Sequence, residues 1–205
     1  SGVWEYEIEA ELIHEFIRNR SRGFAFDPII ASGSSACVLH YIENNKQVKN
    51  GDLLLLDFGA EYGNYNGDLT RCVPANGKFS ERQKQVYNAV LDVHKYARSI
   101  IKPGVPLPDY HAEVCKFTNE KLVELGLFTS QEIKDNPKAF MKYFMHGTSH
   151  HLGLDVHDVM HRFEPIPEGS VLTIEPGIYI PQEGIGVRIE NDVIVNTGKV
   201  TDLMA

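Results

Sequence analysis

The sequence is poor in cysteine, and its few cysteines are badly placed for a disulfide framework. Cys37, Cys72 and Cys115 are the three cysteines among 205 residues, and no two of them form a CxxC pair. An odd number at such wide spacing argues against a set of disulfides and against a structural zinc knuckle. These absences favour a reducing compartment, and we expect a cytoplasmic protein.

Long apolar runs and concentrations of basic residues are also missing. No stretch of about 18 apolar residues could span a bilayer, so the membrane is not expected as a partner. The formal net charge is -8, and the 20 lysines and arginines are scattered rather than gathered in a stripe. Because nucleic-acid binding needs a basic surface, DNA and RNA are not expected either. The excess of carboxylates is consistent with bound divalent cations instead.

Length predicts a single domain over residues 1–205, because a chain of 205 residues is near the upper end for one hydrophobic core. The chain opens with Ser1-Gly2 and continues into a charged amphipathic segment without an apolar signal region. Such a start is typical of a tag remnant before an excised domain. We therefore expect that an upstream part of the parent protein is missing.

Periodicity and capping residues predict an α+β fold. Apolar residues at helical spacing predict helices over 4–19, 81–101 and 109–125, and Ser80 with Gln83 forms a capping box before the second. Alternating or continuous apolar runs bounded by turn residues predict strands over 38–41, 53–58, 65–73, 171–174 and 185–195. The order of strands, helix pair and strands is typical of an α+β domain.

Two aspartates in the first group of strands form a candidate cation site. If the chain folds back through Tyr62-Gly63, Asp57 lies directly opposite Asp68, with Cβ atoms roughly 4.5–5.5 Å apart. Two carboxylates so close repel one another unless a cation lies between them. The alternative is that Asp57 merely ends a strand and Asp68 belongs to an exposed turn.

A second hairpin repeats this arrangement and favours the cation site. Glu175 follows an apolar strand, and it can pair with Glu190 across a turn at Gln182-Glu183. Carboxylates are seldom buried without a partner, so a glutamate in this position indicates a function. Two hairpins thus offer two facing pairs of carboxylates.

A histidine-rich segment supplies a candidate nitrogen ligand. His146 and His150 share one face of the segment in an extended conformation, and His151 points to the other side. A single histidine is more often a hydrogen-bonded core or surface residue than a ligand. We interpret four other histidines in this ordinary way: His14, His94, His111 and His161.

Four carboxylates and one imidazole form an oxygen-rich donor set. Such a set favours manganese, zinc or cobalt in a paired site over a thiolate zinc site. Two divalent ions about 3.5–4 Å apart activate water and polarise a carbonyl, as in aminopeptidases. The donor set therefore predicts hydrolysis without redox chemistry.

The motifs that surround these residues together resemble one family over nearly the whole chain. They are VLHY (38–41), LDFG (56–59), GDLTR (67–71), HGTSH (146–150), LDVHD (154–158), IEPG (174–177) and GVRIE (186–190). This set is similar to the pita-bread, or M24-type, metallopeptidases, which include methionine aminopeptidase, prolidase and aminopeptidase P. The long histidine run resembles the Xaa-Pro branch more than the methionine branch. The resemblance implies a curved, mostly antiparallel sheet covered by helices, with internal pseudo-two-fold symmetry.

The resemblance also implies two metal ions per chain and assigns their ligands. Asp57 would chelate one ion, Asp68 and Glu190 would bridge both, and His150 and Glu175 would complete the second. Glu175 would also act as the acid and base that handles the proton of the attacking water. Manganese is favoured, with zinc and cobalt as the alternatives.

Further active-site residues follow from the resemblance. His40, His146 and His157 would line the pocket and stabilise the oxyanion, with His157 favoured as the oxyanion donor. Arg188 and Thr70 would orient the bridging carboxylates or would simply be polar strand residues.

The implied reaction is release of the first residue from peptides with proline in second position. The tertiary amide before proline has no N–H to donate, and aromatic side chains would form the walls of a pocket for the ring: Tyr41, Phe144 and Tyr179, at least one of which we expect in the core instead. We expect the family's usual N-terminal domain to lie outside this sequence, and we expect the full-length protein to be a homo-oligomer. Three alternatives are a prolidase that accepts only dipeptides, a methionine aminopeptidase and a non-catalytic pita-bread binding module.

Overall fold

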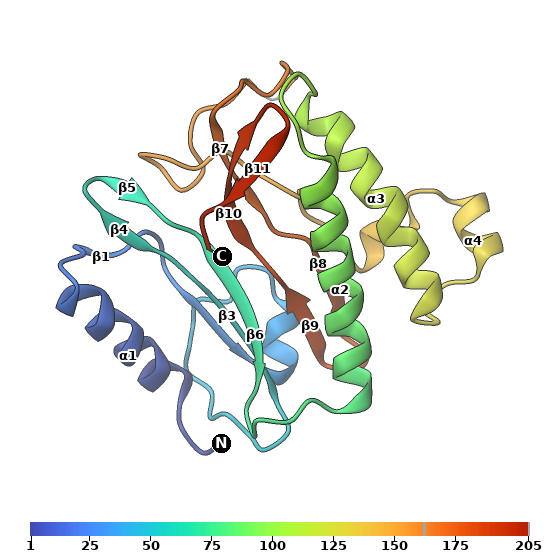
Figure 1. Cartoon of the computed structure of the whole chain (residues 1–205). Coiled ribbons are helices and arrows are strands. Elements are labelled where there is room, and N and C mark those ends of the chain that lie inside the picture. Colours follow the sequence, from blue (N-terminus) through green and yellow to red (C-terminus); the bar gives the residue numbers. More distant parts are fainter. Residues whose placement is uncertain (162, 205) are drawn as a thin grey trace.

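The computed structural model describes residues 1–161 and 163–204 and confirms the predicted α+β composition (Figure 1). Its helices are α1 (Glu5–Arg18), η1 (Gly33–Cys37), α2 (Glu81–Ile100), α3 (Leu107–Glu124), α4 (Ser130–Asp135) and η2 (Ala139–Lys142), of which η1 and η2 are 3-10 helices. In the first part of the chain the strands are β1 (Gly23–Phe24), β2 (Ile29–Ser32), β3 (Leu53–Phe58), β4 (Ala60–Tyr62), β5 (Tyr65–Asn66) and β6 (Leu69–Pro74). After the helices follow β7 (Ser170–Ile174), β8 (Gly177–Ile180), β9 (Ile185–Arg188), β10 (Asn191–Asn196) and β11 (Lys199–Asp202).

Every strand pair in the described part of the chain is antiparallel. The strand orders are β1-β4-β5, β2-β3-β6, β11-β10-β7 and β8-β9. Antiparallel neighbours can be joined by short turns, and the β3–β6 and β7–β10 regions are both such hairpins. The two predicted carboxylate hairpins therefore exist, one before the long helices and one after them.

The three predicted helices lie close to the observed bounds of α1, α2 and α3, whereas α4, η1 and η2 were not predicted. Ser80 caps α2 as predicted, because its side chain accepts the N–H of Gln83 while the Gln83 side chain accepts the N–H of Ser80. Helix α3 begins at Leu107, two residues before the predicted start. Pro108 belongs to its first turn, where the missing N–H has no helical partner to lose. No helix in the described residues has both the length and the apolar character to cross a bilayer.

The strand predicted over residues 38–41 is wrong. Helix η1 ends at Cys37, and the residues that follow form no strand pair. Tyr41 instead turns inward, is 3% exposed and donates its hydroxyl to Oε2 of the buried Glu5 at 2.7 Å. This link to α1 replaces the backbone ladder that would define a strand.

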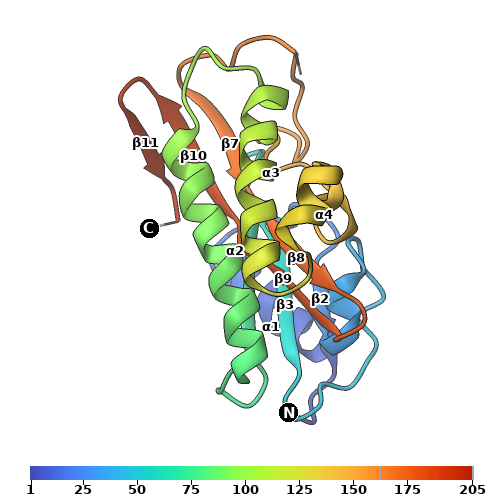
Figure 2. The same cartoon turned by 90° about the vertical axis from the view of Figure 1, so that its right-hand side faces the viewer.

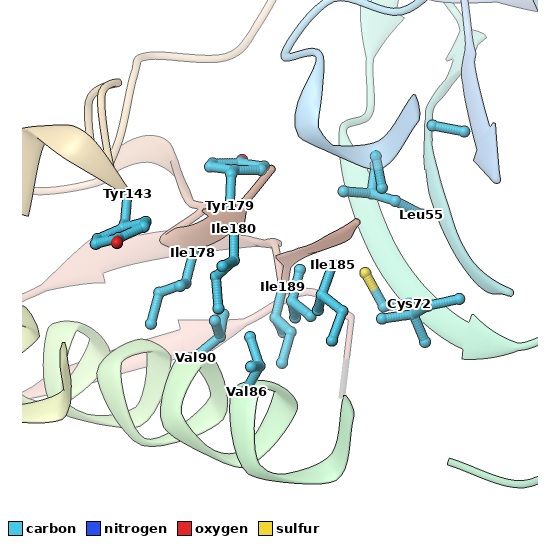
Figure 3. Close-up of a cluster of buried hydrophobic side chains, with 14 of the residues drawn as sticks. Leu55, Cys72, Val86, Val90, Tyr143, Ile178, Tyr179, Ile180, Ile185 and Ile189 are labelled. Atoms are coloured by element: carbon cyan, nitrogen blue, oxygen red, sulfur yellow. The ribbon is translucent and has the colours of Figure 1, made fainter. Parts of the chain in front are cut away.

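The long helices cover one side of the second hairpin. Helices α2 and α3 run side by side (Figure 2), and α2 contacts β7, β8 and β9. Val86 and Val90 of α2 pack in the same cluster as Ile178, Ile180 and Ile185 of the β8–β9 hairpin (Figure 3). A second apolar cluster joins the C-terminal half of α2 to α3, β7 and β10. Burial of these side chains fixes the strands that carry Glu175 and Glu190 against a rigid support.

Candidate metal centre

The first carboxylate hairpin has a different register from the predicted one. Asp57 lies opposite Thr70 rather than Asp68, so the predicted direct pairing is wrong by two residues. The turn is at Gly63-Asn64, with φ of +62° and +69°, rather than at Tyr62-Gly63. Two positive φ values define the turn that suits the twist of a two-residue hairpin loop. Because the shift is even, Asp57 and Asp68 still share one face of the sheet.

Gly59 lets the two strands of this hairpin approach beside Asp68. A Cβ at residue 59 would lie 1.6 Å from the carbonyl oxygen of Gly67, well inside any allowed contact. The next amide, that of Asp68, donates to Oδ2 of Asp192 at 3.0 Å. The backbone of Asp68 is therefore tied to β10, in the other hairpin.

The second carboxylate hairpin has the predicted register. On one side of the glutamates Ile174 pairs with Asn191, and on the other side Gly177 pairs with Arg188. These pairs continue a single register, which places Glu175 opposite Glu190 between β7–β10 and β8–β9.

The donor atoms of three of the predicted ligands converge. Asp68, His150 and Glu190 each offer one ligand atom, and these atoms all lie within 4.8 Å of one another. Nε2 of His150 is 3.4 Å from Oδ2 of Asp68 and 3.6 Å from Oε1 of Glu175. The first hairpin, the histidine segment and the second hairpin thus meet at one point.

Asp57 is held at the edge of this group by Arg188. Nη2 of Arg188 donates to Oδ2 of Asp57 at 2.5 Å, and its Nε donates to Oγ1 of Thr70 at 3.1 Å. Thr70 in turn donates its hydroxyl to Oε2 of Glu190 at 2.6 Å. Arg188 and Thr70 therefore connect Asp57 to Glu190, beside the carboxylates that they were predicted to orient.

Burial makes this group of carboxylates hard to ionise together. Loss of solvent raises the pKa of Asp57 to about 6 and that of Glu175 to about 7, and it raises the pKa of Glu190 well above its usual range. The neighbouring carboxylates contribute to the raised pKa of all three groups, whereas the charge of Arg188 opposes it. Burial lowers the pKa of His150, but the hydrogen bond with Asp68 and the charge of Glu175 raise it overall to about 9.

The unpaired oxygens fit a divalent cation. Oδ1 of Asp57 and Oδ1 of Asp68 are buried, and no hydrogen-bond donor among the described residues reaches either atom. A buried carboxylate oxygen without a partner is costly, and like charges at this distance need positive charge between them. Carboxylate oxygens with one imidazole suit manganese, zinc or cobalt better than a thiolate-type ion. The residues present therefore fit a divalent metal centre.

The three predicted active-site histidines lie around this centre in different environments. His146 donates from Nδ1 to the carbonyl of Gly147 at 2.8 Å, so its Nε2 accepts the hydroxyl of Tyr179 at 2.8 Å. Burial, and then the charge of Arg188, lower the pKa of His146 to about 3, which keeps the ring neutral. His157 and His40 are exposed, and the His157 ring meets the His150 ring edge-on with centroids 4.4 Å apart.

The aromatic residues suggested as pocket walls divide between core and site. Tyr41 is a core residue, bonded to Glu5. Phe144 is fully buried beneath His146, with ring centroids 4.9 Å apart. Tyr179 is also fully buried, but its hydroxyl accepts Nη1 of Arg188 at 2.8 Å and reaches His146. Of the three, only Tyr179 places a polar atom among the site residues.

Two residues near the centre escaped the sequence analysis. Asp192 is 3% exposed and accepts the N–H of Asp68, while its Oδ1 has no hydrogen-bond partner among the described residues. Its position two residues after Glu190, on the same side of a strand, was the available indication. His111 of α3 contacts Thr148, and nothing in the helical pattern distinguishes it from a packing residue.

Comparison with known proteins shows the family of this chain. The family model described as metallopeptidase family M24 matches residues 1–197, and the chain belongs to this family. It is 40% identical over 205 residues to an Xaa-Pro aminopeptidase of Haemophilus influenzae, covering 94% of this chain and 48% of that protein. An Xaa-Pro aminopeptidase of Escherichia coli is 40% identical over 209 residues, covering 95% of this chain and 47% of that protein.

Solved structures of aminopeptidase P have the same fold as this chain. Proline aminopeptidase P II from Yersinia pestis matches with a TM-score of 0.93 and 39% identity, over 100% of this chain and 50% of that one. Aminopeptidase P from Escherichia coli with the inhibitor Pro-Leu matches equally, with a TM-score of 0.93, 39% identity and coverage of 100% and 49%. These likenesses confirm the predicted pita-bread fold and the aminopeptidase P branch. The chain spans about half the length of the relatives that it matches.

Proposed function

We propose that the parent protein is a dinuclear metal hydrolase that releases the first residue from peptides with proline in second position. One observation carries the proposal. Carboxylates from two separate hairpins and the imidazole of His150 meet at one buried point, with the ligand atoms of Asp68, His150 and Glu190 within 4.8 Å of one another. The names of the relatives support the choice of Xaa-Pro substrates.

The proposed ligands divide between two divalent ions. Asp57 would hold one ion, His150 and Glu175 would hold the other, and Asp68 and Glu190 would contact both. When bound, such a pair lowers the pKa of water and polarises a substrate carbonyl. Manganese is the ion that we propose, with zinc or cobalt as substitutes.

Glu175 is the residue proposed to move the proton. Its side chain is 18% exposed, more than the 7% of the Asp68 side chain, so it is the more accessible of the two to water. In the metal-free protein its pKa is raised to about 7 by burial, near the value that suits an acid and base at neutral pH. It takes a proton from the attacking water and returns one to the departing proline nitrogen.

The histidines have separate roles in this proposal. His146 forms hydrogen bonds with Gly147 and Tyr179, and we assign it the role of holding this side of the centre in place. His157 and His40 are exposed, so each is free to donate to a substrate oxygen. We assign the oxyanion to His157, because its ring lies directly against the ligand His150.

Proline suits this site because its amide nitrogen has no hydrogen to donate and its ring is rigid. The proposal includes one catalytic domain over residues 1–205, a homo-oligomeric parent and a cytoplasmic location. The cysteines in the described residues are free, which agrees with a reducing compartment.

The test uses the full-length parent enzyme loaded with manganese. Peptides of the form Xaa-Pro-Yaa with increasing length are incubated with it, and release of the first residue is followed by chromatography. Metal content is measured in the same samples. Loaded enzyme that releases no first residue from any length would refute the proposal, and cleavage of dipeptides alone would make it a prolidase. A Met-Ala peptide and the variant Asp57→Asn serve as negative controls.

A further inference from the structure

Helix α3 contacts the middle of the segment that carries two of the site histidines, residues 146–150. Nδ1 of His111 on α3 and Oγ1 of Thr148 form a hydrogen bond of 2.7 Å. Thr148 is 1% exposed, so its hydroxyl depends on a protein partner rather than on solvent. The contact joins α3 to a segment that belongs to no helix or strand.

Thr148 is a junction between this segment and the second carboxylate hairpin. Its carbonyl accepts the N–H of Glu175 at 2.8 Å. Two residues further on, the N–H of His150 donates to Oγ1 of Thr173, and the N–H of Thr173 donates to the carbonyl of His150. A shift of Thr148 would therefore move both His150 and Glu175, which lie 3.6 Å apart at the centre.

His111 is itself held rigidly. Sγ of Cys115, one turn along α3, lies 3.3 Å from its Nε2. The rings of Phe140 and Phe144 meet the His111 ring edge-on, and Phe144 in turn meets His146. Packing on this side and the hydrogen bond on the other fix the ring between α3 and the segment.

A cysteine and a histidine in contact can also form a nucleophile and its base, but this pair does not. Burial raises the pKa of Cys115 to about 12, so its thiol stays protonated at neutral pH. Cys115 is buried as well, and its contact is with His111 rather than with the metal centre. The pair therefore serves structure rather than nucleophilic attack.

We infer that His111 is a positioning residue, which acts through Thr148 to hold His150 and Glu175 in the geometry that binds metal. Its effect on turnover rests on the proposed function, whereas its effect on metal affinity does not. Residues that orient metal ligands typically contribute about 10–100-fold in affinity or activity. Loss of the bond should therefore weaken metal binding by about that factor without altering any ligand.

The test compares four variants of the full-length enzyme: His111→Leu, His111→Asn, Thr148→Val and the double variant His111→Leu with Thr148→Val. Manganese affinity of the metal-free protein is measured by calorimetry, and kcat and KM are measured on an Xaa-Pro-Yaa peptide. The leucine and valine variants should bind manganese about 10–100-fold more weakly. Their kcat should fall while KM changes little, because the substrate contacts remain.

Two outcomes distinguish positioning from packing. The side-chain amide of asparagine places a polar atom close to the position of Nδ1. His111→Asn should therefore recover most of the manganese affinity. The double variant should bind manganese no more weakly than either single variant, because the two substitutions remove the same hydrogen bond. The matched control is Thr118→Val, which makes the same change on α3 at a hydroxyl that donates to its own helix at Val114. This control should leave the affinity within about twofold of the wild type, because its bond is the ordinary helical one.

Manganese affinity equal to that of the wild type in both His111→Leu and Thr148→Val would overturn the inference. Additive losses in the double variant would also overturn it. If His111→Leu does not fold, the nearly isosteric Thr148→Val still decides the question. A wild-type enzyme that binds manganese but cleaves no Xaa-Pro peptide would refute the proposed function, and the affinity comparison would remain valid.

Discussion

Arg188 on β9 donates Nη2 to Oδ2 of Asp57 on β3 at 2.5 Å, across the boundary between the two carboxylate hairpins. The arginine is 4% exposed, and the fork of its guanidinium also donates to Thr70 and Tyr179. A single buried cation thus organises three acceptors around the candidate centre. Its charge opposes the rise that burial causes in the pKa of Asp57.

Replacing Arg188 should impair the site even when the positive charge is kept. Lysine cannot serve three acceptors in the planar geometry of a guanidinium. We therefore expect kcat/KM of Arg188→Lys to fall about 10–100-fold, with a further loss in Arg188→Met. Peptide cleavage and manganese content are the measurements. Wild-type kcat/KM in the lysine variant would show that charge alone suffices.

Replacing the proposed acid and base should affect turnover more than substrate binding. Glu175→Gln removes both a proposed metal ligand and the group proposed to transfer the proton. Loss of a general acid and base typically costs about 10²–10⁴-fold, and we expect a fall in kcat of at least this size. Rates are compared at saturating manganese, so that lower metal affinity does not mask the effect. Glu183→Gln, at the exposed turn of the same hairpin, is the control and should keep normal kcat.

Metal binding should release protons and weaken as the pH falls. In the metal-free protein burial raises the pKa of Asp57 to about 6 and that of Glu175 to about 7, so these groups hold protons near neutral pH. Metal needs both carboxylates ionised and the proposed ligand His150, whose pKa is raised to about 9, deprotonated, so apparent affinity should rise from about pH 5 to about pH 9. Calorimetry in two buffers with different ionisation enthalpies measures the proton release. Equal heats in both buffers at pH 6 would contradict this prediction.

His94 should make the fold sensitive to acid independently of the metal centre. This residue of α2 is 5% exposed, and burial lowers its pKa to about 4 from the usual 6.5. Its folded pKa lies below the unfolded one, so its contribution is complete above pH 6.5 and is lost as the pH falls towards 4. The free energy of unfolding falls by roughly 3 kcal/mol once the pH is below the folded pKa of His94.

The His94 prediction is tested by urea denaturation at pH 7 and pH 4.5 with a chelator present. The wild type should lose more stability between these values than His94→Leu, which cannot titrate at this position. All other groups are the same in both proteins, so the difference belongs to His94. Equal losses would mean that His94 is solvated or paired in the folded state.

The sequence predicts the second hairpin correctly but the first one only in part. Between Glu175 and Glu190 the strands β8 and β9 are joined by one short turn, so the register follows from symmetry about Gln182-Glu183. In the first hairpin the turn lies at Gly63-Asn64, one residue later than the predicted Tyr62-Gly63. Asn64 adopts a positive φ, which residues other than asparagine and glycine rarely do. The turn at Asn64 shifts the strand register by two residues from the predicted one.

Contacts between distant segments account for most of what the sequence could not show. The region of residues 38–41 has a strand-like composition, but Tyr41 is fixed by Glu5 of α1, which lies far away in sequence. His111 has the same helical spacing as ordinary core residues, and only the fold places its Nδ1 at Thr148. Periodicity reports which face of an element is buried, whereas it carries no information on which atom that face meets.

The order of the chain has a consequence for synthesis. Asp57 and Asp68 precede α2, whereas Glu175 and Glu190 follow α4, so the candidate centre is incomplete until Glu190 has left the ribosome. A chain that stops before β7 has only half of the carboxylates of this centre. Metal binding at the centre therefore requires that both hairpins are complete and docked.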